Sequence, residues 1–237
     1  MAMTKLECER LPFSELQIVV QACREAGLSV IVIGGLATGS YLQRYRRYTE
    51  DIDLVVPATD VEELLTMLQS CGFDITGTRQ WWKASKEMGD HELIVDVVTE
   101  TIAESATEQS HTLSLSPLPP LAVVTPFSKE LGELACEIPA AGPEDLIILK
   151  LLSGRDKGLI DLTALLLESF KRIDLTALHE KIATAHLQMT MNLAIAEWRN
   201  ALRSGELGYL WEATYDRPLT RRQVASLLRK IERLTPE

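Results

Sequence analysis

The chain has 237 residues, of which 46% are hydrophobic and 24% are charged. This balance is ordinary for a globular protein with one large domain or two smaller ones and a buried core. The formal net charge of −10 argues against a nucleic-acid footprint that covers the whole surface, although local basic clusters could still bind phosphate.

Helix and strand patterns alternate in the N-terminal half. Residues 14–26 carry apolar side chains at helical spacing, and the apolar run over residues 28–33 predicts a buried strand. Gly34 and Gly35 then permit a tight turn, after which residues 36–45 predict a helix.

A second set of elements follows this turn. The sequence DIDLVVP predicts a strand closed by Pro57, and the next helix has Thr59 or Asp60 as its N-cap. Three further strands are predicted over residues 73–78, 80–86 and 91–100. The polar, proline-bearing residues 100–120 predict a long loop.

The character of the chain changes near residue 141. Short strands are expected around residue 122 and over residues 134–138, and Pro143 suits the first turn of a helix. From that proline to the end every segment has a helical pattern, so the last third of the chain is predicted to be helical.

The strand at DIDLVVP begins with two acids. Successive side chains of a strand alternate between its faces, so Asp51 and Asp53 point the same way, roughly 6.5 Å apart along the backbone. Two carboxylates directed at one place repel each other unless a positive charge lies between them, and all-oxygen ligands favour Mg²⁺ or Mn²⁺. Asp96, an acid among apolar neighbours on a later strand, is the candidate third ligand.

A structural explanation of the same acids stays open at this point. Asp51 could cap a turn, Asp53 could pair with a nearby arginine, and Asp96 could be an exposed strand residue. The two-acid pattern by itself favours this explanation.

The order of these motifs resembles the nucleotidyltransferase fold of the DNA polymerase beta superfamily. That pattern has a strand ending in two small residues, here Gly34 and Gly35, then two acids on the next strand and a third acid later. The stretch VIGGLATGSYLQRYRRYTEDIDLVV, with Thr49 before the first acid, is similar to bacterial nucleotidyltransferases of the AbiEii type. The later stretch PEDLIILKLLSGRDKGLIDL is also similar to that group.

The resemblance implies a fold and a division of the chain. We expect an α/β (α+β) nucleotidyltransferase fold with a mixed sheet over residues 1–140, and a helical C-terminal domain over residues 141–237.

The resemblance also implies roles for the motif residues. Asp51, Asp53 and Asp96 would bind Mg²⁺ or Mn²⁺ and perform catalysis, with Asp51 and Asp53 holding the metal that carries the nucleoside triphosphate. Gly34 and Gly35 would let backbone amides approach the phosphates.

The resemblance implies further nucleotide contacts, although this chain departs from the family's pattern at two positions. Many family members have serine or threonine after the second glycine where this chain has Leu36, so Thr38 or Ser40 would have to bind the phosphate. Similar proteins often have aspartate in place of Gly158. The remaining candidate phosphate ligands are basic and lie at one helix end, namely Lys150, Arg155 and Lys157, with Asp161 expected to pair with Arg155 or Lys157.

We therefore predict a metal-dependent nucleotidyltransferase that moves a nucleoside monophosphate, such as that of ATP, to an acceptor hydroxyl. The AbiEii resemblance favours an RNA end or a protein as acceptor, a toxin–antitoxin role and a cognate antitoxin as partner. One alternative is an inactive nucleotide- or partner-binding module of the same fold. Another is a transferase for small cationic molecules of the aminoglycoside type, which an acidic surface would suit.

Three further features remain open. Trp81 and Trp82 point to opposite faces of a strand, and one of them could stack on a base, although core packing is the plainer explanation. Residues 217–234 predict an amphipathic helix with a basic, solvated face. His179 and His186, seven residues apart, are predicted to share a helical face as surface or packing residues.

The spacing of the cysteines and the lengths of the apolar segments indicate the cellular compartment. The four cysteines are widely spaced and form no CxxC pair, which indicates reduced thiols rather than a zinc site or a disulfide scaffold. The N-terminus is charged where a signal peptide would be apolar, and no apolar stretch reaches the roughly 18 residues of a membrane span. We expect a cytoplasmic protein with no membrane partner.

Overall fold

The computed structural model describes residues 5–78, 81–89, 91–103, 110–112, 121–124 and 129–235. The chain divides into two compact units. Unit 1 comprises Met1–Ser40, Tyr48–Thr101 and Leu115–Ala141, and unit 2 comprises Tyr41–Arg47, Ile102–Ser114 and Gly142–Glu237. The predicted division into one domain over residues 1–140 and a second over residues 141–237 stays a prediction.

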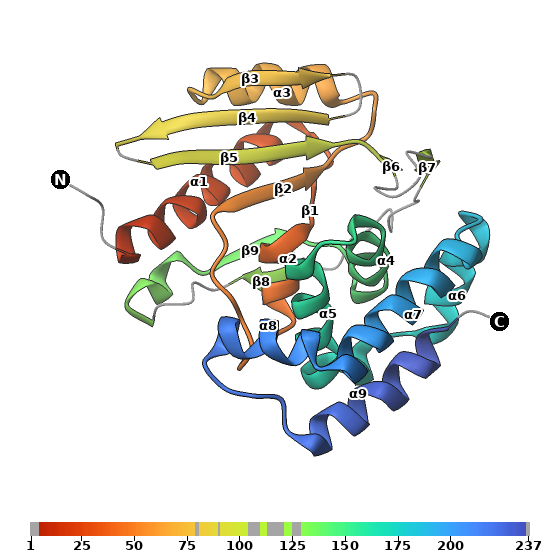
Figure 1. The fold of residues 1–237 in the computed structure, drawn as a ribbon. Helices are drawn as coiled ribbons and strands as arrows, with labels where there is room; N and C mark the ends of the chain where they lie inside the picture. Colours follow the sequence, from red (N-terminus) through yellow and green to blue (C-terminus); the bar gives the residue numbers. More distant parts are fainter. Residues whose placement is uncertain are drawn as a thin grey trace. The chain divides into compact units, whose positions relative to one another are not determined.

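Unit 1 is built on a mixed sheet of five strands in the order β1-β2-β5-β4-β3 (Figure 1). β2 and β5 are parallel, whereas the other neighbours are antiparallel. The strands are β1 (Ile31–Val32), β2 (Asp51–Val55), β3 (Asp74–Thr78), β4 (Trp81–Met88) and β5 (His91–Val98). Together with the helices below, this sheet confirms the predicted fold class.

One face of this sheet forms the core of unit 1. Ile52 and Leu54 of β2 and Val95 and Val97 of β5 have no exposed surface. The helices that contact the sheet include α1 (Lys5–Ala26) at β2 and β5, α2 (Gly34–Ser40) at β2 and α3 (Val61–Ser70) at β3. Because strand side chains alternate, this buried row directs Asp51, Asp53 and Asp96 to the opposite face.

Smaller elements complete unit 1. The short strands expected near residue 122 and over residues 134–138 are β8 (Leu121–Val124) and β9 (Cys136–Pro139), which pair antiparallel. The 3-10 helix Lys129–Leu134 lies between them in the chain. Within the stretch predicted to be a loop, β6 (Thr101–Ala103) and β7 (Ser110–Thr112) form a two-stranded sheet, which apart from Thr101 belongs to unit 2. Residues 104–109 and 113–120 lie outside the described residues.

Several predicted bounds differ from those observed. α1 begins at Lys5 and runs through Pro12, and β1 covers only Ile31–Val32. The helix predicted over residues 36–45 is α2 (Gly34–Ser40), which ends at Ser40. A physical reason for this early end is that the backbone N–H groups after it donate to a carboxylate elsewhere in the chain, as described below.

Unit 2 is helical, and its first helix begins at Pro143 as predicted. Trp198 and Trp211 are fully buried in it, and Thr220 and Gln223 form a capping box before the predicted amphipathic helix. The helices are α4 (Pro143–Ser153), α5 (Asp156–Ser169), α6 (Leu175–Thr184), α7 (Gln188–Ser204), α8 (Glu206–Tyr215) and α9 (Arg221–Leu234), with a 3-10 turn at Phe170–Arg172.

The prediction that His179 and His186 share a helical face is wrong. α6 ends at Thr184, and His186 has a positive φ of 57°. The backbone N–H of Leu187 donates to the carbonyl oxygen of Ile182, which closes the helix end before α7 begins.

Among the side chains that the structure describes, Cys23, Cys71 and Cys136 are free thiols. Burial raises the pKa of Cys23 to about 12 and that of Cys136 to about 11. Both groups therefore stay protonated near neutral pH and are weak nucleophiles. No helix among the described residues is long and apolar enough to cross a membrane.

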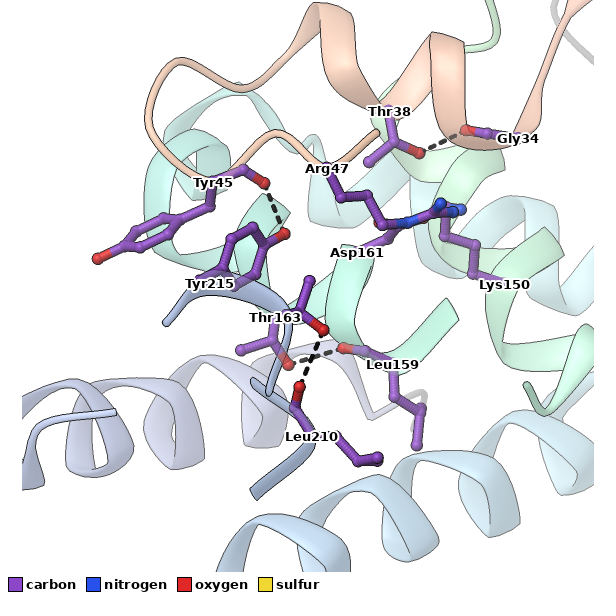
Figure 2. A network of polar contacts seen from close by, with 11 residues as sticks. Gly34, Thr38, Tyr45, Arg47, Lys150, Leu159, Asp161, Thr163, Leu210 and Tyr215 are labelled. Carbon is purple, nitrogen blue, oxygen red and sulfur yellow. Dashed lines mark hydrogen bonds and ion pairs between the residues drawn. The ribbon is translucent and has the colours of Figure 1, made fainter. Parts of the chain in front are cut away.

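The segment Tyr41–Arg47 is anchored on the helices of unit 2. The carboxylate of Glu168 accepts hydrogen bonds from the backbone N–H groups of Gln43, Arg44 and Tyr45 at 2.6 to 2.9 Å. The Tyr215 hydroxyl donates to the carbonyl oxygen of Tyr45 at 2.7 Å (Figure 2). These bonds use backbone groups that a longer α2 would have kept within the helix.

Replacing Glu168 by alanine is expected to destabilise unit 2 by about 2 kcal/mol, because hydrogen bonds to a charged group contribute more than neutral ones and three backbone donors would lose their partner. Urea unfolding followed by circular dichroism measures this. Glu180→Ala, an exposed acid on α6, is the matched control and should change the free energy of unfolding by less than about 0.5 kcal/mol. Equal effects of the two substitutions would contradict the anchoring role of Glu168.

Candidate active site

The acids predicted from the sequence lie on one face of the sheet in unit 1. In the parallel pair of β2 and β5, Asp53 is directly opposite Asp96, and Asp51 is opposite Ile94. Asp51 is exposed, whereas Asp53 and Asp96 are partly buried. Neighbouring strands lie about 4.8 Å apart, so Asp53 and Asp96 project side by side from adjacent strands.

Gly34 lies against the carboxylate of Asp53. Its φ of +68° belongs to the left-handed region that favours glycine, and a Cβ added there would overlap Oδ2 and Cγ of Asp53. The backbone N–H of Ile33 donates to the carbonyl oxygen of Asp53 at 2.9 Å. The turn after β1 is therefore packed against the second acid, and this contact requires glycine.

The hydroxyls predicted to bind phosphate are engaged within α2. Thr38 is fully buried and its Oγ1 donates to the carbonyl oxygen of Gly34 at 2.7 Å (Figure 2). Ser40 Oγ donates to the carbonyl oxygen of Ala37 at 2.6 Å. Gly35 lies in the first turn of α2 and is partly exposed. Phosphate binding by these residues stays a prediction, and the geometry favours Gly35 over Thr38.

The donor set of this face fits a hard divalent cation. Asp53 and Asp96 supply carboxylate oxygens from adjacent strands, and Asp51 lies two residues before Asp53 on the same face of β2. Within the described ranges, no group of three or more His, Cys, Asp and Glu side chains is close enough together to hold a metal ion. Mg²⁺ in nucleotide sites usually takes one or two carboxylates and completes its shell with water and substrate phosphates, so the two neighbouring acids suffice.

Lys150 and Asp161 take part in an ion-pair cluster in unit 2. Asp161 is buried, and its carboxylate binds Lys150 Nζ at 2.6 Å and Arg47 Nε at 2.8 Å. Figure 2 shows both basic side chains directed at this acid. The prediction that Asp161 pairs with Arg155 or Lys157 is wrong, because these two partners reach it instead. The charge of Lys150 is balanced inside the unit.

Arg155 and Lys157 are exposed at the beginning of α5, where Arg155 is the N-cap residue. They are thus accessible to an anionic ligand, as a phosphate contact requires. Gly158 is buried, and a Cβ there would come within 3.3 Å of the carbonyl oxygen of Lys150. Close packing of α4 and α5 is therefore a physical reason why this chain has glycine at position 158, where similar proteins often have aspartate.

Sequence reasoning missed a lysine beside the acids. Lys83 of β4 is directly opposite Asp96 of β5, so Asp53, Asp96 and Lys83 form a row across three strands. Lys83 Nζ binds Glu92 at 3.0 Å, and this hydrogen bond lowers the pKa of Glu92. Alternation along β4 could have placed Lys83 on the correct face, but its pairing with Asp96 depends on the register.

Comparison with known proteins bears on the first half of the chain. Residues 15–115 match the model of the family described as aminoglycoside-2''-adenylyltransferase. The matched stretch contains Gly34, both acids of β2 and Asp96. The chain carries a nucleotidyltransferase domain. This confirms the enzyme class predicted from the motifs, whereas the narrower AbiEii resemblance is not shown by it.

Solved structures that are similar to the chain include two of the same protein. One is the solution structure of the antibiotic-resistance factor ANT(2'')-Ia, with 20% sequence identity, a TM-score of 0.42, and coverage of 61% of this chain and 72% of that chain. The other is a crystal structure of ANT(2'')-Ia in complex with adenylyl-2''-tobramycin, with 15% identity, a TM-score of 0.44, and coverage of 74% of this chain and 97% of that chain. No curated protein matches the sequence.

Proposed function

We propose that the protein transfers AMP from ATP, with Mg²⁺, to a hydroxyl group of an aminoglycoside. The observation that carries this proposal is the pairing of Asp53 with Asp96 on adjacent parallel strands, with Gly34 packed against Asp53, inside residues that match the adenylyltransferase family. The family's name supports the acceptor class, and the pairing of the acids supports their role as reacting groups.

The reaction joins the acceptor oxygen to the α-phosphorus and breaks the bond from that phosphorus to the oxygen bridging to the β-phosphate. Pyrophosphate leaves with that oxygen and its electron pair. Asp96 accepts the proton of the attacking hydroxyl, a role within reach of a carboxylate next to the metal-binding acid. When bound, Mg²⁺ stabilises the negative charge that develops on the phosphate oxygens.

The acceptor class agrees with the charge of the protein. Aminoglycosides are amino sugars that carry several positive charges near neutral pH, and the chain has a net charge of −10. Opposite charges raise the rate of encounter between enzyme and substrate and disfavour an anionic acceptor such as RNA. On this ground we rank an aminoglycoside above an RNA end.

Label transfer tests the proposal. ATP, GTP, CTP and UTP, each labelled at the α-phosphate, are incubated with Mg²⁺ and the full chain, and a panel of aminoglycosides, total RNA and protein lysate is offered as acceptor. We expect label on aminoglycosides that have a free 2''-hydroxyl, from ATP in preference to the other nucleotides. Omission of the divalent cation should abolish the signal.

The other outcomes separate the remaining hypotheses. Label on RNA or protein would contradict an aminoglycoside acceptor and support the AbiEii-type reading, with an antitoxin as the partner to seek. Binding of nucleotide with no transfer to any acceptor would support the inactive binding module.

A further inference from the structure

Trp81 is an exposed aromatic residue on the face of the sheet that carries the acids. Its side chain is 45% exposed at the start of β4. Trp81 pairs with Val98, and Lys83, two residues further on, pairs with Asp96. Residues two apart on a strand share a face, so Trp81 lies on the same side of the sheet as Asp96 and Asp53.

The sheet order sets the direction in which Trp81 lies from the acids. Gly34 packs against Asp53 and follows β1, so the glycine turn is at the β1 edge of β2. β5 and then β4 follow on the opposite side of β2. Asp53 is therefore flanked by the glycine turn in one direction and by Asp96, Lys83 and Trp81 in the other.

An in-line displacement places the attacking and leaving oxygens on opposite sides of the phosphorus. With the triphosphate against Gly34 and Gly35, the acceptor hydroxyl has to arrive from the side of β5 and β4. An aromatic ring on that side meets the acceptor rather than the phosphates. This step rests on the proposed function.

We propose that Trp81 is the surface against which a cationic amino-sugar ring of the acceptor packs. Tryptophan is the side chain whose ring face attracts a cation most strongly, and a ring stacked on it also covers apolar surface. Trp82 points to the opposite face and pairs with Val97, a residue of the core row, so it is not available for this contact.

Steady-state kinetics of the full chain test this role. Trp81→Ala is expected to raise KM for the aminoglycoside about tenfold, with kcat and KM for ATP changed less than about twofold. Trp81→Phe, which keeps a ring, should recover part of the lost affinity. Tyr209→Ala is the matched control, since Tyr209 is an aromatic residue of α8 with 76% exposure, and it should leave all three constants unchanged.

The results distinguish failure of this inference from failure of the proposed function. Transfer to aminoglycosides by the wild type, with an unchanged acceptor KM in Trp81→Ala, would overturn the role of Trp81 alone. A rise in KM for ATP instead would assign Trp81 to the adenine base and also overturn it. Absence of aminoglycoside transfer in the wild type would overturn both. Titration with aminoglycoside without nucleotide should quench tryptophan fluorescence in the wild type and less in Trp81→Phe.

Discussion

Asp53→Asn is expected to lower the rate of adenylyl transfer by at least about a thousandfold, because loss of a metal ligand removes several kcal/mol of transition-state stabilisation. Asp53 is next to Asp96 in register and touches the glycine turn, so it connects the acid pair with the site proposed for the triphosphate. The amide keeps the shape of the side chain and removes its charge. The measurement is kcat/KM for label transfer from ATP.

Asp74→Asn is the matched control for this substitution. Asp74 is an exposed acid at the start of β3, opposite Ser85, and lies outside the row formed by Asp53, Asp96 and Lys83. Its replacement should leave kcat/KM within about twofold of the wild type, since a surface substitution away from the site has little effect. Circular dichroism should show the same fold for both variants. More than a tenth of wild-type activity in Asp53→Asn would contradict the role given to this acid.

The pattern of the sequence predicted which side chains share a face, because alternation is a local property of a strand. Ile52 and Leu54 are buried, and Asp51 and Asp53, which alternate with them, are directed away from the core, as expected. The position of Asp96 beside Asp53 is not local. It depends on a parallel pairing between strands more than 30 residues apart in the chain, and a shift of one residue would have moved Asp96 to the core face.

The partners of the basic and hydroxyl groups assigned to phosphate by resemblance could not be predicted from the sequence. Lys150 binds Asp161, and the sequence gives no indication that Asp161 also binds Arg47, which is 114 residues away. Thr38 likewise donates to its own helix. Long-range partners determine which basic or hydroxyl groups are available to a ligand, and they follow from tertiary packing.

A long-range partner also determines where α2 ends. Residues 36–45 have a helical pattern, and the helix nevertheless ends at Ser40. Glu168 accepts from the backbone N–H groups of Gln43, Arg44 and Tyr45, and this competing acceptor lies more than 120 residues away. Local propensity is a weak predictor where a distant charged group binds the same backbone.

Gly34→Ala is expected to reduce transfer by about a hundredfold or more and to lower the free energy of unfolding by about 1 to 2 kcal/mol. The stability loss comes from a φ of +68°, which costs an alanine about that much. The activity loss comes from the new Cβ, which would overlap the Asp53 carboxylate and force it to move. A displacement of about 1 Å in a catalytic group is enough for such a loss of rate.

Gly39→Ala separates the local contact from a general effect of adding a methyl group to α2. Gly39 lies in the same helix, and a Cβ there meets no atom within 4 Å. Alanine is favoured over glycine inside a helix by about 1 kcal/mol, so this variant should be at least as stable as the wild type and fully active. The double variant Gly34→Ala/Asp53→Asn should be hardly less active than Asp53→Asn alone, because both changes act through one carboxylate. Additive losses would instead show that Gly34 contributes to transfer independently of Asp53.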